Sequence, residues 1–408
     1  MIDVAVKKKI QNPKKKTRMN KQTTQFKIQP FRRWIQIGFF LVTLWIGLEF
    51  ILFVHQLEKG LVPTISRPPG VEAFLPISAL ISLRYWILTG VFNTIHPSAM
   101  VLLLIILATA LLLKKGFCSW VCPIGLLSDF LAKLHIKIFD RQIGLPRWLD
   151  YPLRSLKYLL MFFFLYAVFV QMNVIDLHKF IYSPYNRVAD IKMLKFFAEM
   201  SPTTFWTLVI LFLLSLTIPF FWCRYLCPYG ALLGWISWFS LFKIHRDKET
   251  CIDCEKCTRV CPARIKIHKI ETVFSDECHA CLSCIDACPV KDTLYLSATR
   301  TKWKMPRKVY AASIVLLFLL GTTVARISGH WQNSITHEEY LYHVKHLNEP
   351  LYHHNRGQAP DYSTDQYSIL NEKERNKNLK HNEKSQYIDK KLKKNEQKYY
   401  SKIWRSNS

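Results

Sequence analysis

Residues 251–262 read Cys251-Ile-Asp-Cys254-Glu-Lys-Cys257-Thr-Arg-Val-Cys261-Pro262, and the same cysteine spacing returns 27 residues later as Cys278-His-Ala-Cys281-Leu-Ser-Cys284-Ile-Asp-Ala-Cys288-Pro289. A [4Fe–4S] cluster needs four thiolates that converge on its corners, and each segment supplies four cysteines. Zinc sites and disulfides are the alternatives. Zinc sites use Cys-x2-Cys pairs separated by a spacer rather than triplets followed by Cys-Pro. The doubled pattern therefore predicts two [4Fe–4S] clusters.

This spacing resembles that of bacterial two-cluster ferredoxins, and the resemblance implies how the ligands are shared. In that family three closely spaced cysteines hold one cluster, while the cysteine before proline ligates the other cluster. The resemblance assigns the first cluster to Cys251, Cys254, Cys257 and Cys288. It assigns the second cluster to Cys278, Cys281, Cys284 and Cys261.

The composition combines two features that an ordinary soluble domain does not combine. Half of the 408 residues are hydrophobic, yet the formal net charge is +27. The apolar residues lie in blocks and the basic residues lie between them, which is typical of a multi-span membrane protein. A nucleic-acid partner is not expected, because the basic residues flank apolar spans instead of forming a groove interleaved with aromatic residues. The twelve cysteines all fall within four motifs, which favours metal and redox chemistry over disulfides.

Five apolar segments are predicted to span a bilayer, namely 34–54, 98–113, 156–172, 205–222 and 308–327. A sixth apolar segment, 74–92, contains Arg84 near its centre. An arginine there costs roughly 2.5–3.5 kcal/mol on insertion scales. We therefore expect 74–92 to form a re-entrant or interfacial helix. The positive-inside rule then places the cysteine motifs on the cytoplasmic side of a bacterial cytoplasmic membrane.

The predicted fold is mainly α: a polytopic membrane helix bundle with an inserted α+β domain of the two-cluster ferredoxin type. The expected organisation is a disordered basic cytoplasmic arm, a membrane domain, the ferredoxin-like domain, a last transmembrane helix and a polar, largely disordered tail. Their bounds are 1–33, 34–242, 243–302, 303–327 and 328–408.

The remaining four cysteines form an internal repeat of the pattern Cys-x3-Cys-Pro-x-Gly, each copy at the exit of an apolar segment. The pairs are Cys118 with Cys122 and Cys223 with Cys227. An i, i+4 spacing places both thiols of a pair on one helix face. Gly125 and Gly230 are expected to let the backbone turn sharply. We interpret the four thiols as a membrane-side redox site, acting as two dithiol pairs or as ligands of a further metal centre. Buried structural cysteines are the alternative.

Two further cofactors, haem and quinone, are considered for side chains near the apolar segments. Four histidines near the outer ends of spans could be considered as haem ligands, but no two lie in the middle of facing helices, so haem is not expected. These are His55, His96, His178 and His330. Three further side chains could contact a quinone head group or anchor the chain at the membrane interface. They are Arg84, Trp120 and Arg224.

Taken together, the spans, the two Cys-x3-Cys-Pro motifs and the doubled ferredoxin motif resemble the NapH/NosR/CcoG group of membrane polyferredoxins. The segment 67–78 and the later Ser328-Gly-His-Trp-Gln are most similar to the YccM-type branch, and the resemblance covers about residues 30–335. It implies electron transfer from membrane quinol through the clusters to a partner protein, or, in one branch, reduction of copper.

We therefore expect a membrane-bound iron–sulfur protein that relays electrons between the quinone pool and a redox partner, as a component similar to a quinol dehydrogenase. A copper or other metal reductase is one alternative. A redox-sensing assembly or regulatory factor is another.

Overall fold

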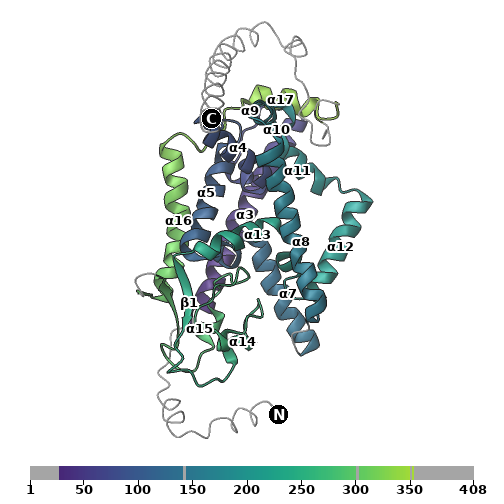
Figure 1. The fold of residues 1–408 in the computed structure, drawn as a ribbon. Helices are drawn as coiled ribbons and strands as arrows, with labels where there is room; N and C mark the ends of the chain where they lie inside the picture. Colours follow the sequence, from purple (N-terminus) through teal and green to yellow (C-terminus); the bar gives the residue numbers. More distant parts are fainter. Residues whose placement is uncertain (1–26, 141–143, 300–302, 350–351, 353–408) are drawn as a thin grey trace, which may run out of the picture.

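The computed structural model describes residues 27–140, 144–299, 303–349 and 352. It is mostly helical, and five apolar helices run alternately between its two ends (Figure 1). They are α3 (Gln29–Glu58), α5 (Pro97–Leu113), α8 (Arg147–Tyr166), α12 (Pro202–Thr217) and α16 (Arg307–Ile327). One end carries a small sheet and the two cysteine triplets, and we call it the cluster end. The opposite end carries short helices, and we call it the cap end.

Three helical segments of the described chain are long and apolar enough to cross a membrane: Gln29–Glu58, Trp148–Gln171 and Arg307–Ile327. A fourth candidate joins α11 (Ala189–Ala198) to α12 across a bend of 79°. Helix α5 is apolar but has only 17 residues. These lengths agree with a mainly α membrane protein, and the count of five spans stays a prediction.

The segment that contains Arg84 forms η1 (Pro69–Phe74) and α4 (Pro76–Thr89). With 14 residues, α4 is about 21 Å long, which is shorter than the roughly 30 Å of a hydrocarbon core. The guanidinium of Arg84 donates to the carbonyls of Val168 and Met172, the latter at 2.6 Å. Both carbonyls lie at the short π-helix η2 (Ala167–Gln171) that continues α8. The charged group is therefore hydrogen-bonded by backbone groups that a regular helix would have used itself.

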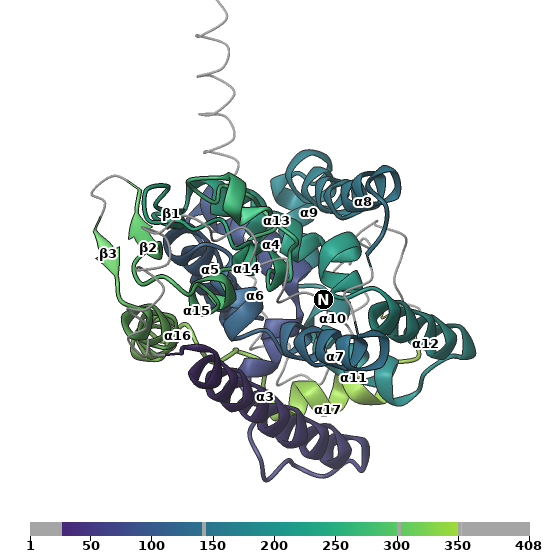
Figure 2. The same ribbon diagram turned by 90° about the horizontal axis from the view of Figure 1, so that it is seen from below.

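Residues 242–299 and 303–305 fold into an antiparallel sheet with two short helices. Strand β1 (Phe242–Arg246) pairs with β2 (Leu294–Ala298), with Phe242 opposite Ala298, and β2 pairs with β3 (Lys304–Met305). Helices α14 (Lys256–Arg259) and α15 (Ser283–Asp286) each contain the third cysteine of a triplet, and η5 (Ile267–Lys269) lies between them. Figure 2 views this end directly and shows the sheet beside α16.

Short helices complete the rest of the bundle. At the cluster end these are α6 (Gly116–Trp120), α7 (Pro123–Phe139), η3 (Trp222–Leu226), α13 (Pro228–Ile236) and η4 (Ser237–Phe239). At the cap end α9 (Val174–Ile181), α10 (Pro184–Arg187) and α11 lie beside α17 (His337–Lys345) (Figure 1).

Both predicted polar termini are partly structured. Helix α3 begins at Gln29, inside the expected arm 1–33, and the side chain of Arg32 is buried against Asp129 at 2.9 Å. The first part of the expected tail also packs on the helices, because Trp331 and Tyr340 are buried. Residues 1–26 and 353–408 lie outside the described residues, so the disorder expected there stays a prediction.

The sequence Arg67-Pro-Pro-Gly-Val-Glu72 builds a buried ionic network under the cap. Arg67 lies 2.7 Å from Glu72 and 2.6 Å from Asp190, and Glu72 also accepts a hydrogen bond from the amide of Ala99 at 2.9 Å. The ring of His96 contacts Glu72 at 3.2 Å and the Asn186 carbonyl at 2.6 Å. Burial by itself raises the pKa of Glu72, but the charge of Arg67 and the contact with His96 lower it to about 2. The network fixes η1 against the start of α5.

Candidate redox and iron–sulfur site

Each cysteine triplet contains two residues in left-handed backbone conformations, which turn the loop. The φ angles are +52° at Asp253 and +59° at Glu255 in the first loop, and +47° at Ala280 and +61° at Leu282 in the second. The two pairs occupy equivalent positions of the 27-residue repeat. Left-handed conformations are costly for residues with a Cβ, so they persist where the fold requires the turn. Here they curl each Cys-x2-Cys-x2-Cys segment around a common centre.

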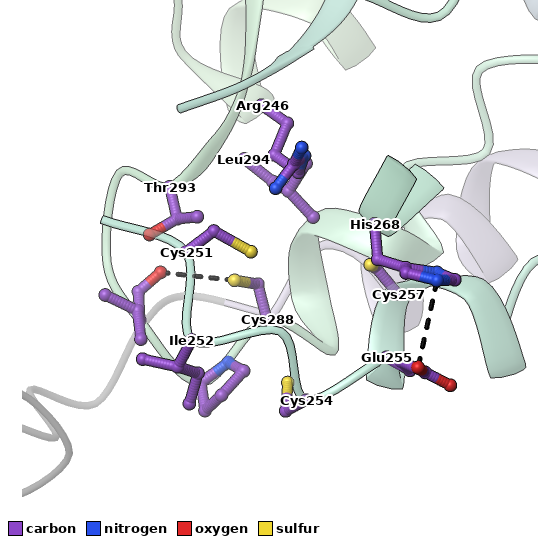
Figure 3. Close-up of a pocket in the computed structure, with 12 residues that line it drawn as sticks. Arg246, Cys251, Ile252, Cys254, Glu255, Cys257, His268, Cys288, Thr293 and Leu294 are labelled. Carbon is purple, nitrogen blue, oxygen red and sulfur yellow. Dashed lines mark hydrogen bonds and ion pairs between the residues drawn. The ribbon is translucent and has the colours of Figure 1, made fainter. Parts of the chain in front are cut away.

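The sulfur atoms of the first triplet share a hollow with the fourth cysteine of the second motif. Cys251, Cys254, Cys257 and Cys288 line one hollow, whose empty volume including its open mouth is ≈ 340 Å³ (Figure 3). Burial and, to a smaller extent, the neighbouring thiols of the first triplet raise the pKa of Cys288 to about 11. This grouping is the crossed one implied by the ferredoxin resemblance. We call these four cysteines the distal site.

The other four ferredoxin cysteines lie together deeper in the domain. Burial raises the pKa of Cys261 to about 12, and the nearby thiols of Cys281 and Cys278 act in the same direction. Cys284 interacts electrostatically with Cys261 on one side and with Cys257 of the distal site on the other. We call Cys261, Cys278, Cys281 and Cys284 the proximal site. All four are buried, whereas three of the distal cysteines are partly exposed.

These donor sets fit [4Fe–4S] clusters. Thiolates are the ligands that such clusters use, and each site brings four cysteines together beside a loop with left-handed turns. Among the described residues, no group of three or more His, Cys, Asp or Glu side chains is arranged to hold a single metal ion. When bound there, the clusters would supply one-electron carriers.

The proximal site is attached to the helix bundle through its backbone carbonyls. Gln29 donates to Cys281 O at 2.8 Å, Ser119 to His279 O at 2.5 Å, and Trp120 to Ala280 O at 3.1 Å. The buried ammonium of Lys157 adds an ion pair with Glu277 at 2.5 Å. The distal site has no comparable set of contacts within the described residues. The second triplet is thus the part of the domain that the membrane helices hold.

The two Cys-x3-Cys-Pro motifs adopt similar breaks in helical structure. Cys118 lies in α6 and Cys223 in η3, while Cys122 and Cys227 have extended backbones and precede the prolines that begin α7 and α13. Proline suits the first position of a helix, because no helical partner is needed for its nitrogen there. The expected role of the glycines is wrong: neither has a positive φ. A Cβ at Gly125 would lie 2.0 Å from Cys118 O, so this glycine permits a close backbone approach instead.

All four of these cysteines line one large cavity. Its empty volume, including its open mouth, is ≈ 2520 Å³. On the apolar side it is bounded by one face of α3, including Phe39 and Ile46, and one face of α16, including Phe318 and Thr322. The rings of Phe39 and Phe318 are 5.5 Å apart, so these two helices touch at this point. The cavity therefore extends from the four thiols between helices that are apolar enough to lie in a membrane.

At its cluster end the cavity reaches the proximal site. Pro262, Ala263, Glu277 and His279 lie in its wall and flank Cys261 and Cys278 in the sequence. One ring nitrogen of His279, Nδ1, is buried without a hydrogen-bond partner. Burial raises the pKa of Cys281, but a hydrogen bond from the His279 ring lowers it to about 7. His279 thus lies between the cavity and a proximal cysteine.

Two further polar side chains in this wall were not singled out from the sequence: Lys115 and Tyr229. Burial lowers the pKa of Lys115, but the charges at Cys118, Glu277 and Cys227 outweigh this and leave the pKa raised. The sequence signal for Lys115 is its position, three residues before a repeated cysteine.

The three residues considered for a quinone head group have other partners. Arg84 lies on α4, bonded to η2. Trp120 is fully buried and bonded to Ala280 O. Arg224 lines the cavity, but its guanidinium pairs with Asp150 at 3.0 and 3.1 Å. These three side chains therefore stabilise contacts between helices and loops of the fold.

Comparison with known proteins identifies the family. A family described as a 4Fe-4S binding domain matches residues 95–146 and 201–247, which contain the two Cys-x3-Cys-Pro motifs. A 4Fe-4S dicluster domain matches residues 243–289. YccM of Escherichia coli (strain K12), whose name assigns it to electron transport, is 42% identical over 318 residues, or 76% of this chain and 88% of YccM. The chain belongs to the YccM-type family of 4Fe-4S electron transport proteins.

Other proteins are similar to the chain over shorter lengths. The ferredoxin-type protein NapH of Haemophilus influenzae is 33% identical over 48% of this chain and 68% of NapH. The regulatory protein NosR of Stutzerimonas stutzeri is 28% identical over 46% of this chain and 25% of NosR. No solved structure matches the chain. The predicted family and iron–sulfur chemistry are confirmed.

Proposed function

We propose that the protein relays electrons between the membrane quinone pool and a redox partner protein through two [4Fe–4S] clusters. One observation carries the proposal: a single cavity connects an apolar space between α3 and α16 to four thiols and then to residues that flank the proximal cysteines. A lipid-soluble carrier needs an apolar entrance, and an electron relay needs that entrance to end at a redox centre.

The burial of the two cluster sites supports an order for the relay. The proximal site adjoins the cavity through His279 and Glu277 and is buried. The distal site is partly exposed, with Cys251, Cys254 and Cys288 near the surface. Cys284 and Cys257 link the two sites electrostatically. We therefore place the proximal site next to the quinone and the distal site next to the partner protein.

The stoichiometry of quinol oxidation suits this arrangement. One quinol that becomes quinone gives up two electrons and two protons, and two one-electron carriers take up the two electrons. The chain itself holds polar groups at the inner end of the cavity, among them Tyr229, Glu277 and His279, that can bind and orient the ring. The apolar walls exclude water from the path between the ring and the proximal site. For electrons flowing toward the quinone, the same balance holds in reverse.

We assign Cys118, Cys122, Cys223 and Cys227 to the step between the quinone and the proximal site. Their shared cavity and their place in the matched 4Fe-4S binding domain favour ligands of a further centre over inert thiols. We also propose that the cluster end faces the cytoplasm, because most basic residues between spans lie at that end.

The proposal is tested in isolated membranes under anaerobic conditions. A quinol is added, and reduction of the clusters is followed by electron paramagnetic resonance. We expect reduced-cluster signals that a quinone-analogue inhibitor suppresses. Clusters that respond to dithionite but never to quinol would overturn the proposal, and reoxidation by Cu(II) without a partner protein would favour a metal reductase instead.

A further inference from the structure

Lys115 is a buried cation that no protein group in the described structure binds. Its side chain belongs to the cavity wall, and the residue is only 5% exposed. Its ammonium makes no hydrogen bond or ion pair with any other residue that the structure describes, and the charges of Cys118, Glu277 and Cys227 act on it only from beyond that distance. Lysines are almost never fully buried unless they are paired, because removing an ammonium from water is costly. An unpaired ammonium that borders a cavity therefore indicates a ligand inside it.

Two other buried lysines at the same end show the usual arrangement. Lys114 donates to Val273 O at 3.0 Å, and Lys157 pairs with Glu277 at 2.5 Å. Each of these ammonium groups fixes the ferredoxin region to the helix bundle. Lys115 differs from both, although it follows Lys114 directly in the chain.

The backbone between the two adjacent lysines explains their different directions. Lys114 has φ +57° and ψ −163°, a region that residues other than glycine rarely adopt. This turn ends α5 and lets Lys114 reach the sheet region at Val273, while Lys115 lies in the wall of the cavity. A strained conformation of this kind persists only where surrounding contacts enforce it.

The surroundings of Lys115 define the chemistry of the missing partner. A Cβ placed at Gly230 would lie 3.6 Å from Lys115 Nζ and 3.4 Å from Cys227 Sγ, so the ammonium borders an open space beside the thiols. Beyond that space the cavity is apolar, with Phe117, Phe39 and Phe318 in its walls. The partner must therefore combine an oxygen acceptor at one end with a largely apolar body. A small inorganic anion has the acceptor but not the body.

We propose that Lys115 donates a hydrogen bond to a ring oxygen of the quinone and so fixes the head group beside the four membrane-side thiols. This inference rests on the proposed function and adds the residue that recognises the substrate. A charge-assisted hydrogen bond from an ammonium in an apolar site binds an oxygen more strongly than a neutral donor does. The contact also sets the distance between the ring and the thiols.

The test compares Lys115→Met with Lys115→Arg and with a matched control, Lys195→Met, which removes a cation at the cap end. Cluster reduction in anaerobic membranes is measured against quinol concentration, and full reduction by dithionite reports cluster content. We expect Lys115→Met to raise the quinol concentration for half-maximal rate by about tenfold or more, the effect of one charge-assisted hydrogen bond. Lys115→Arg should restore part of the affinity, and Lys195→Met should resemble the unmodified protein.

The outcomes separate this inference from the proposed function. Unchanged quinol affinity in Lys115→Met, with normal dithionite reduction, overturns the role of Lys115 and leaves the relay intact. Failure of the unmodified protein to accept quinol electrons overturns the proposed function itself.

A second variant covers the case in which Lys115→Met loses its clusters. Gly230→Ala keeps every charge and places a methyl group in ordinary contact distance of Lys115 Nζ. It should assemble both clusters and still raise the quinol concentration needed, because the methyl occupies the space assigned to the ring oxygen. A Gly230→Ala protein with unmodified quinol affinity would count against the proposal.

Discussion

The indole nitrogen of Trp120 donates a 3.1 Å hydrogen bond to the carbonyl of Ala280, which joins the first Cys-x3-Cys-Pro motif to the second cysteine triplet. The two residues are 160 positions apart in the chain. Trp120 is fully buried, and its ring also packs edge to face on Tyr310 of α16 at 5.6 Å. One side chain therefore couples a membrane-side thiol pair, the proximal site and the last apolar helix.

Replacing Trp120 with phenylalanine should weaken this junction. The aromatic body is largely kept, but Ala280 O loses its donor inside a buried region, which costs about 1–3 kcal/mol. We expect faster release of iron from the proximal site in the presence of a chelator, while distal-site signals persist longer. Trp303→Phe is the control, since Trp303 is exposed. Equal rates of iron loss in Trp120→Phe and in the unmodified protein would contradict this role.

The crossed grouping of cysteines predicts which cluster each fourth ligand supports. Anaerobically purified protein should contain about eight iron and eight sulfide from the two ferredoxin-type sites, with more iron where the membrane-side thiols hold a further centre. Cys288→Ser should perturb the distal site, because Cys288 lies with the first triplet. Cys261→Ser should perturb the proximal site. Power-saturation electron paramagnetic resonance of the two variants distinguishes the sites, and the reverse assignment would mean that the ligands are not crossed.

Gly125 and Gly230 occupy matching places in the sequence repeat but should respond differently to alanine. At Gly125 the added Cβ would meet Cys118 O at 2.0 Å, a backbone atom that cannot move aside. We expect Gly125→Ala to destabilise the protein by several kcal/mol and to reduce its yield in membranes. At Gly230 the nearest atom would be Cys227 Sγ at 3.4 Å, so Gly230→Ala should fold. Thermal unfolding in detergent compares the two directly.

The direction of the helices gives a test of topology. The end of α7 and the ferredoxin region lie at the cluster end, whereas α4 and α10 lie at the cap end (Figure 1). Fusion reporters at residues 140 and 295 should therefore read cytoplasmic, and reporters near 65 and 185 should read outside. An outside signal at residue 140 would mean that the segment containing α4 crosses the membrane.

The sequence is informative where the chemistry is local and repeats. The cluster loops follow from eight cysteines at fixed spacing, and the apolar helices follow from uninterrupted runs such as 98–113. The contacts that join these parts cannot be predicted in the same way. Ser119 meets His279, and Trp120 meets Ala280, through side chain to carbonyl bonds between positions 160 residues apart. Such bonds depend on the packed arrangement and leave no periodic pattern.

The different roles of Lys114 and Lys115 also cannot be predicted from the sequence. A lysine pair after an apolar run is the usual end of a membrane span, and that interpretation explains Lys114 and Lys115 equally well. Only the strained backbone at Lys114 and the absence of a described partner for Lys115 separate the two residues. Similarly, the sequence alone predicts that Gly125 permits a sharp turn. The close approach to Cys118 O, 2.0 Å from a Cβ at this position, is visible only in three dimensions.

The membrane-side thiols provide the last prediction. Cys118→Ser combined with Cys223→Ser removes one thiol from each motif and leaves the ferredoxin cysteines untouched. Serine is close in size to cysteine, so the loss of packing should be small. Both ferredoxin-type clusters should assemble and accept electrons from dithionite, which needs no membrane site. Reduction by quinol should fall at least about tenfold, which corresponds to about 1.4 kcal/mol in the barrier.

A further variant, Cys122→Ser, tests whether the second thiol of a motif is as necessary as the first. Cys122→Ser should give the same loss when the four thiols act as one centre, because each ligand is then needed. When the thiols act as two independent pairs, Cys122→Ser should cause only the loss that belongs to its own motif, and adding Cys223→Ser should lower the rate further, whereas in a single centre the added change has no further effect. Double-mutant comparison separates these cases, because residues that act as a unit are not additive. Quinol reduction at the unmodified rate in every variant would assign the thiols a structural role and place the entry of electrons at His279, where the cavity reaches the proximal site without them.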